Sequence, residues 1–429
     1  MPLIPPLLRK ADFRNFWLGQ TISVFGDQVT QLAIPIIAVL VLQADAATMG
    51  TLTAVGLLPH LLFSLPAGVW LDRVRDRKRL MIAADVLRAA LIVTIPVAFV
   101  LGALGMPQLF VISFLVGSLA VAFDISWNTV FVSVTPRDQF VSANSLFSGS
   151  RSLAWVAGPS IGGALIQIAG AAGAMVIDAL SYIGSAFFLR RVRAVEPPIE
   201  TDPGTVRAQL ASGLSFLARD PIMRPTLIAV ATVNLFSFAF TALFILYVTT
   251  DLAVTPGVLG LALGAGAVGG VIGALIAARV GRRIGLGPAY ALGLIGFPAF
   301  LILVPIVDGP PTAVLAMLFA MEFGAGIGVM ILDINVGAII AARTPDAIRG
   351  RAGGAFRFIN YGIRPIGALM GGLLGGLIGV RPTLLVVTVA AMGGVLWLVG
   401  TPVLRLRDLP EPGGAHEGQS GGPSGSIDL

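Results

Sequence analysis

Carboxyl and guanidinium groups stand inside long apolar runs of this chain. Asp27 lies about midway along the first run, and Gln31 follows one helical turn later. Glu322 and Asp333 are eleven residues apart, which places both on one face of a helix. Arg364 lies two turns into the run after them. Ionisable groups in such surroundings are costly and indicate a proton, ion or substrate pathway.

The same groups also have purely structural interpretations. Asp27 is either a carboxylate that takes up a proton or cation in a central cavity, or a structural hydrogen-bond partner of another span. We expect Arg364 to pair with Glu322 or Asp333. That pair is either static, or it opens when the carboxylate is protonated and so shifts a conformational equilibrium.

Four further positions belong to the same class of buried polar residue. Asp124 and Asp333 occupy matching places in two similar stretches, which favours a cytoplasmic gate over direct proton coupling. Asp85 and Arg88 are three residues apart and are predicted to form a structural pair. Asp178 is expected at the outer face, solvated by the interface.

Composition excludes most other chemistry. The chain has no cysteine and only two histidines, His60 and His416, so thiolate catalysis and histidine-based metal sites or triads are not expected. His60 is predicted to be a packing residue. No phosphate-binding loop of the type that hydrolyses ATP is present. We therefore predict neither an enzyme nor a resident cofactor or metal.

The apolar runs predict an all-α integral membrane protein. Hydrophobic residues make up 56% of the 429 residues and charged residues 12%, against about 25% in soluble domains. Runs of about 20 apolar residues cross a bilayer. Twelve such spans are predicted, at about 15–42, 48–71, 80–103, 107–134, 150–168, 174–190, 225–249, 256–278, 285–307, 312–341, 356–379 and 382–404.

Basic residues follow this topology. Nearly all of them fall in the even-numbered breaks and at the two termini, while Arg381 alone lies in an odd-numbered break. Only Arg88 and Arg364 lie inside spans. The positive-inside rule then places both termini in the cytoplasm. Because the basic residues follow the membrane topology and do not gather on one surface, nucleic acid is not expected as a partner.

The spans divide six and six around a central segment. Residues 1–190 and 225–404 form the predicted halves, and 191–224 a cytoplasmic linker with an amphipathic helix at Val206–Arg219. Residues 405–429 are rich in Gly, Pro and Ser and are predicted to be disordered. Short matches between the halves, 206 to 209 residues apart, indicate an internal repeat with a binding site between the halves.

Two short motifs then carry a family resemblance. The loop after the second span reads Gly68-x-x-x-Asp72-Arg73 and continues to Arg77-Lys78, similar to the loop signature of the major facilitator superfamily. The fifth span contains a Gly-Pro-x-x-Gly core, similar to the motif of antiporters in that superfamily. Its residues are Gly158, Pro159 and Gly162. The loop would act as a conformational latch through Asp72.

Other stretches resemble the branch of macrolide-type drug exporters and siderophore exporters, among them 18–35 and 364–368. The resemblance implies export of small amphiphilic compounds across the cell membrane, driven by the proton gradient through alternating access. A monomer suffices for this mechanism, with the lipid bilayer and the small-molecule substrate as partners. The alternatives are an uptake carrier for a nutrient or lipid-like solute, and a membrane sensor or assembly partner that transports nothing.

Overall fold

The computed structural model describes residues 5–63, 76–193 and 206–407, and within them it is helical throughout, without a strand. Eleven helices of this part are long and apolar enough to cross a membrane. One of them, α6 (Phe140–Arg190), has 51 residues and contains Gly170 at φ 74°, where the helix kinks. Because α6 covers both the fifth and the sixth predicted span, the twelve predicted crossings are accounted for.

Each half contains six of these crossings. The first half consists of α1 (Ala11–Ile36), α2 (Ala46–Phe63), α4 (Arg77–Val100), α5 (Met106–Val134) and α6. The second half consists of α8 (Met223–Thr250), α9 (Pro256–Ile284), α10 (Leu286–Leu301), the short α11 (Leu303–Ile306), α12 (Pro311–Arg343), α13 (Arg349–Ile378) and α14 (Val380–Met392). A π-helical turn, Ile37–Val41, extends α1.

Several predicted boundaries were wrong, among them the starts of α6 and α13. α6 begins at Phe140, ten residues before the predicted start of the fifth span, because Phe140 and Phe147 join an aromatic cluster with Phe131 on α5 and the helix continues beyond the apolar run. The last span leaves the α-helical conformation at Gly393 and continues as a 3-10 helix to Leu398. Apolar length alone locates the run and not the end of the helix.

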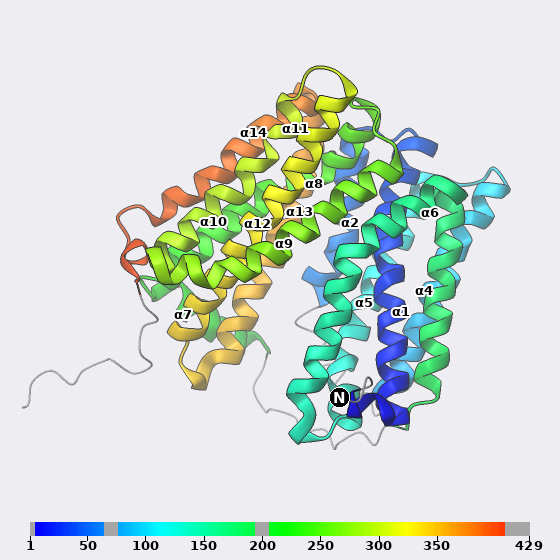
Figure 1. Cartoon of the computed structure of the whole chain (residues 1–429), viewed down its shortest axis with the longest axis horizontal. Helices are drawn as coiled ribbons and strands as arrows, with labels where there is room; N and C mark the ends of the chain where they lie inside the picture. Colours follow the sequence, from blue (N-terminus) through cyan, green and yellow to red (C-terminus); the bar gives the residue numbers. More distant parts are fainter. Residues whose placement is uncertain (1–4, 64–75, 194–205, 408–429) are drawn as a thin grey trace, which may run out of the picture.

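The halves meet mainly through two helix pairs, α2 with α13 and α6 with α9, and α8 of the second half also contacts α1 and α2. Glycines allow the backbones to touch at both contacts. A Cβ on Gly50 would lie 2.6 Å from the Cα of Gly372, and a Cβ on Gly163 would lie 2.9 Å from the Cα of Gly260. Gly50 and Gly260 lie in the first five residues of α2 and α9, Gly372 lies six residues before the end of α13, and Gly163 lies seven residues before the kink of α6 at Gly170. The two bundles diverge toward the side where the N-terminus lies (Figure 1).

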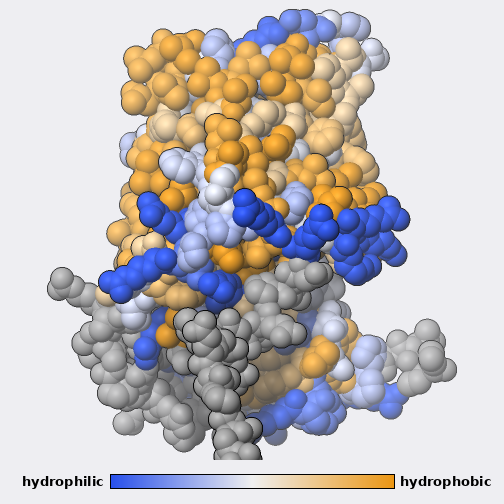
Figure 2. All heavy atoms as spheres, turned by 90° about the vertical axis from the view of Figure 1, so that its left-hand side faces the viewer, coloured by the Kyte–Doolittle hydropathy of each residue, from blue (hydrophilic) through white to orange (hydrophobic). Residues whose placement is uncertain are grey.

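The lipid-facing surface is apolar, as the span prediction requires. Figure 2 shows a broad hydrophobic face on the second half, with hydrophilic side chains gathered toward its ends. Exposed Leu, Val, Ile and Phe side chains occur along most of the spans. An apolar surface of this extent marks a membrane or protein interface, so the chain is a multi-pass membrane protein.

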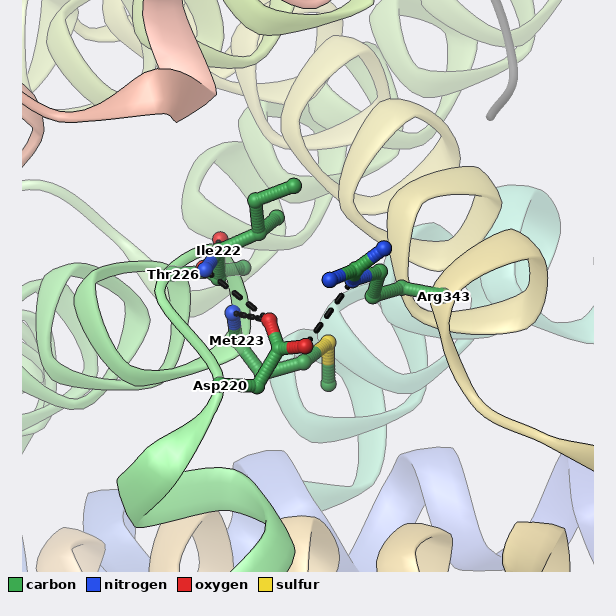
Figure 3. Close-up of polar contacts among 5 residues, drawn as sticks. All are labelled: Asp220, Ile222, Met223, Thr226 and Arg343. Carbon is green, nitrogen blue, oxygen red and sulfur yellow. Dashed lines mark hydrogen bonds and ion pairs between the residues drawn. The ribbon is translucent and has the colours of Figure 1, made fainter. Parts of the chain in front are cut away.

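The linker helix α7 (Val206–Arg219) covers the residues predicted to form an amphipathic helix. Its Leu217 packs with Met223 of α8 and Ala355 of α13. After it, Asp220 accepts hydrogen bonds of 2.9 Å from the backbone N–H groups of Ile222 and Met223, and so caps the start of α8. Its other oxygen pairs with Arg343 at the end of α12, at 2.9 Å (Figure 3). This contact ties the linker to the second half.

The predicted latch loop lies partly outside the described residues, including Gly68, Asp72 and Arg73. The described part begins with Asp76, which caps α4 by accepting from the backbone of Arg79. Arg77 is buried at the start of α4. Lys78 donates to the carbonyl of Val192, 3.1 Å away, and so joins the start of α4 to the end of α6.

Candidate functional site

The first half contains a buried arginine with a buried carboxylate beside it. Arg88 and Asp85, one turn apart on α4, are 4% and 0% exposed, and their closest charged atoms are 3.7 Å apart. The guanidinium carbon of Arg88 also lies over the rings of Phe123 on α5 and Tyr182 on α6, at 5.2 and 5.4 Å. The predicted structural pair is therefore present, and three side chains, those of Asp85, Phe123 and Tyr182, contact its arginine.

Asp27 reaches this cluster from α1. The phenolic hydroxyl of Tyr182 donates to Asp27 Oδ1 at 2.5 Å. Tyr182 thus contacts Arg88 with its ring and Asp27 with its hydroxyl. As a residue Asp27 is half-buried, whereas Asp85 is fully buried. Asp27 is therefore less buried than Asp85.

Asp178 on α6 is the third carboxyl group, and its predicted place was wrong. It is fully buried rather than solvated at the interface. Thr30 of α1 donates to one of its oxygens, and Ser181 donates to the other at 3.0 Å. Gly26 leaves the space that Asp178 and Ser181 occupy, because a Cβ there would overlap both side chains. Hydrogen bonding inside the protein replaces the expected interfacial water.

The second half contains a differently built arginine site. The guanidinium carbon of Arg364 on α13 lies 4.8 Å from the ring centre of Phe238 on α8 and 4.4 Å from that of Tyr361. Its Nε donates to Oδ1 of Asn234 at 3.2 Å. The predicted ion pair is not formed: within the described chain Arg364 has no salt bridge to Glu322 or Asp333. Aromatic faces and an amide hold this charge instead.

The remaining acids of the spans are not paired in this conformation. Glu322 is half-buried on α12 and packs against Gly266 of α9, without a hydrogen bond or ion pair among the described residues. Asp124 and Asp333 are both exposed, and each lies ten residues before the end of its helix, α5 or α12. Their matching places follow from the repeat, and their predicted gating role stays a prediction.

The glycine and proline motif of the fifth span lies where α6 contacts two other helices. A Cβ on Gly158 would meet the side chain of Gln28 on α1, and one on Gly162 would lie 3.4 Å from the Cα of Val29. The carbonyl of Pro159 lies against Gly260 of α9 in the other half. The motif therefore brings α6 close to α1 on one side and to the second half on the other.

The observed surroundings of Gln31 and His60 differ from the predicted ones. Gln31 is exposed and makes no hydrogen bond in the described structure, so it does not join the Asp27 cluster. His60 is packed, as predicted, but against the other half: its ring stacks on Tyr361 with centroids 6.0 Å apart.

Sequence reasoning missed the residues that hold these charges. For Asp178 a signal was available, because Ser181, Tyr182 and Ser185 follow it at helical spacing and lie on one face. Asn234 and Phe238 are also one turn apart, but nothing in the sequence separates them from ordinary packing residues. Their role depends on the approach of α13, which is a tertiary contact.

The arrangement suits proton exchange better than bond making. In the first half, Asp85 lies beside the Arg88 guanidinium, Asp27 joins them through Tyr182, and the buried Asp178 is a third carboxyl group, so the cluster contains more acidic than basic side chains. The part of the chain that the structure describes contains no group of three or more His, Cys, Asp or Glu side chains that could hold a metal ion.

Comparison with known proteins gives matches along the chain. Residues 3–411 match the family described as transmembrane secretion effector. The macrolide efflux protein A of Streptococcus pyogenes is 27% identical over 187 residues, which cover 43% of this chain and 45% of that protein. The multidrug efflux pump Tap of Mycolicibacterium fortuitum is 25% identical over 408 residues, covering 90% of this chain and 93% of Tap.

Solved structures agree on the fold. A bacterial homologue of the iron transporter ferroportin, solved in an inward-facing state, aligns with a TM-score of 0.74 at 17% identity. The alignment covers 92% of this chain and 99% of that one. At this identity the likeness concerns the fold alone, which is that of a membrane transporter.

Proposed function

Because the chain belongs to the transmembrane secretion effector family of the major facilitator superfamily, we propose that it exports small amphiphilic compounds by proton-coupled alternating access. It is a membrane transporter and not an enzyme. The names of its relatives, a macrolide efflux protein and a multidrug efflux pump, support the direction of transport. The distribution of basic residues supports cytoplasmic termini in the cell membrane.

One observation carries the proton coupling: Asp27 is the least buried of three carboxyl groups in the cluster that contains Arg88. When Asp27 takes up a proton, it loses its charge attraction to Arg88. The hydrogen bond from Tyr182 then joins two neutral groups and weakens. Because Asp27 belongs to α1 and Tyr182 to α6, this change acts on the packing of two spans in the first half.

Alternating access would use the two glycine contacts between the halves. In the described conformation they join the ends remote from the termini. Opening on that side requires Gly50 and Gly372 to separate, together with Gly163 and Gly260. Protonation in the first half would change the relative free energies of the two conformations, which is the requirement for a coupled switch.

The experiment measures dye accumulation in inside-out membrane vesicles, where export from the cell appears as uptake. We expect wild-type vesicles energised by a proton gradient to accumulate a fluorescent amphiphile and to lose it with an uncoupler. Asp27→Asn should reduce accumulation to the uncoupled level. Asp308→Asn, which removes an exposed carboxyl group far from the cluster, is the matched control and should transport normally. Full accumulation by Asp27→Asn would remove Asp27 from the mechanism.

A further inference from the structure

We propose that Arg364 binds an anionic group of the transported amphiphile, such as a carboxylate, sulfonate or phosphate. This inference rests on the proposed function and gives it a substrate class. The starting observation is a cation inside a span that has no carboxylate within ion-pair distance among the described residues, although the charge of Asp333 acts on it from farther away. Such a charge is costly in a membrane protein. A ligand that brings the opposite charge would offset that cost.

The guanidinium of Arg364 lies against two aromatic rings and is hydrogen-bonded at one edge. Phe238 and Tyr361 lie 4.8 and 4.4 Å from its central carbon, and Asn234 accepts from Nε at 3.2 Å. Asn234 is itself fixed, because its amide donates to Asn360 at 3.2 Å and to the carbonyl of Val230 at 3.1 Å. A side chain restrained in this way loses little conformational entropy when a ligand binds.

The two terminal nitrogens of Arg364 remain available. They make no hydrogen bond or ion pair in the described structure, and they are not among its buried unpaired atoms. Arg88 differs, because its Nε is buried without a partner and its side chain is only 4% exposed. The free edge of Arg364 presents parallel N–H donors, a geometry that matches the two oxygens of a carboxylate or phosphate.

The site also touches the first half of the molecule. His60 of α2 stacks on Tyr361, one of the two rings that hold Arg364, and Leu61 contacts Gly362. Arg364 therefore lies next to the contact between the halves. Aromatic and apolar walls with a single charged group are typical of pockets that bind small amphiphiles.

The repeat explains why only one such site exists in the described chain. Arg364 and Gly158 are separated by 206 residues, and so are Asn234 and Gln28. In the first half, the side chain of Gln28 packs on Gly158. In the second half, the shorter Asn234 leaves room for the arginine and accepts its hydrogen bond. The first half therefore contains the carboxyl cluster, and the second half contains the proposed anion site.

Binding can be measured without transport. The probes are dansyl-undecanoic acid and its methyl ester, which differ in charge and hardly in shape, titrated into the purified protein in a neutral detergent. We expect the wild type to bind the acid at least about tenfold more tightly than the ester, which corresponds to about 1.4 kcal/mol. Arg364→Gln should remove this preference. Arg364→Lys should keep part of this preference, because the positive charge remains while the paired N–H donors of the guanidinium are lost.

Arg279→Gln is the matched control, because it removes an exposed arginine at the end of α9 and should keep the wild-type preference. Thermal unfolding of each variant checks that it is folded. Should Arg364→Gln unfold, Phe238→Leu and Tyr361→Leu, which remove only the aromatic faces, should still reduce the preference. Equal binding of acid and ester by the wild type, or an unchanged preference in folded Arg364→Gln, would overturn the assignment.

A lipid headgroup offers the same anionic chemistry, so the titration is repeated in nanodiscs. We expect equal binding of the acid in phosphatidylcholine and in phosphatidylglycerol discs. Loss of binding only in phosphatidylglycerol would assign the anion to lipid and overturn its assignment to the substrate. Neither measurement needs a proton gradient, so failure of the efflux experiment and failure of this one are distinguishable.

Discussion

The two arginines inside the spans, Arg88 and Arg364, differ in the groups that surround their positive charges. Arg88 is sealed, with a carboxylate at 3.7 Å and two aromatic rings around it. Arg364 has aromatic rings as well, but its polar partner is a neutral amide and its terminal nitrogens are free. The proposed division of labour, with proton exchange in the first half and ligand binding in the second, rests on this difference.

Stability should separate the two sites most strongly. Arg88→Gln leaves Asp85 buried without its partner, and breaking a buried pair costs about 3–5 kcal/mol. Arg364→Gln removes a charge that has no carboxylate partner, so we expect a much smaller change. Thermal unfolding in detergent compares the two variants. Similar losses in both would show that Arg364 is also a structural residue.

A double variant tests whether Asp85 is the partner that matters. Asp85→Asn in the Arg88→Gln background removes the unpaired charge, so it should recover part of the lost stability. The expected coupling is about 1–3 kcal/mol, the range found for contacting residues. Additive losses in the double variant would mean that the rings of Phe123 and Tyr182, rather than Asp85, hold Arg88.

Much of the fold could be predicted from the sequence, and the reason is physical. Twelve apolar runs and the basic loops between them follow from the bilayer itself, and the structure and the family match confirm the fold class. The spacing also predicted the Asp85–Arg88 pair, because both residues lie on one helix. Local periodicity is sufficient when the partners are three residues apart.

Contacts between helices were predicted less well. Arg364 was expected to pair with an acid of α12, and its partners are Asn234 and Phe238 of α8 instead. Asp178 was expected in the interface, and it is buried against Thr30. In both cases the rotation of one helix against another decides the partner. One sequence contains no measure of that rotation.

The two tyrosines offer a finer test of the same comparison. Tyr182 donates its hydroxyl to Asp27, whereas Tyr361 contributes only its ring to Arg364 among the described contacts. A hydrogen bond to a charged group contributes about 1.5–3 kcal/mol. Tyr182→Phe should therefore shift the pH dependence of dye accumulation, while Tyr361→Phe should leave it unchanged. Equal effects of the two variants would contradict the division of labour.

The smallest effect is expected at a third arginine, at the end remote from the N-terminus. Arg381 hydrogen-bonds to the exposed Asp308 at 2.8 Å, and this bond and its charge lower the pKa of Asp308. The lowered pKa means that the pair contributes at neutral pH and loses its contribution as the pH falls through the folded-state pKa. Because Asp308 is 79% exposed, Asp308→Asn should hardly change thermal unfolding at neutral pH. A large loss of thermal stability in Asp308→Asn would show that exposed ion pairs also stabilise this protein.

Proton exchange linked to substrate binding is the central claim, and it can be measured directly. Purified protein in a weakly buffered detergent solution, with a pH-sensitive dye, reports protons released or taken up when an amphiphilic substrate is added. We predict a clear proton signal for the wild type and for Asp308→Asn, and none for Asp27→Asn that still binds the substrate. An undiminished signal from Asp27→Asn would contradict the account.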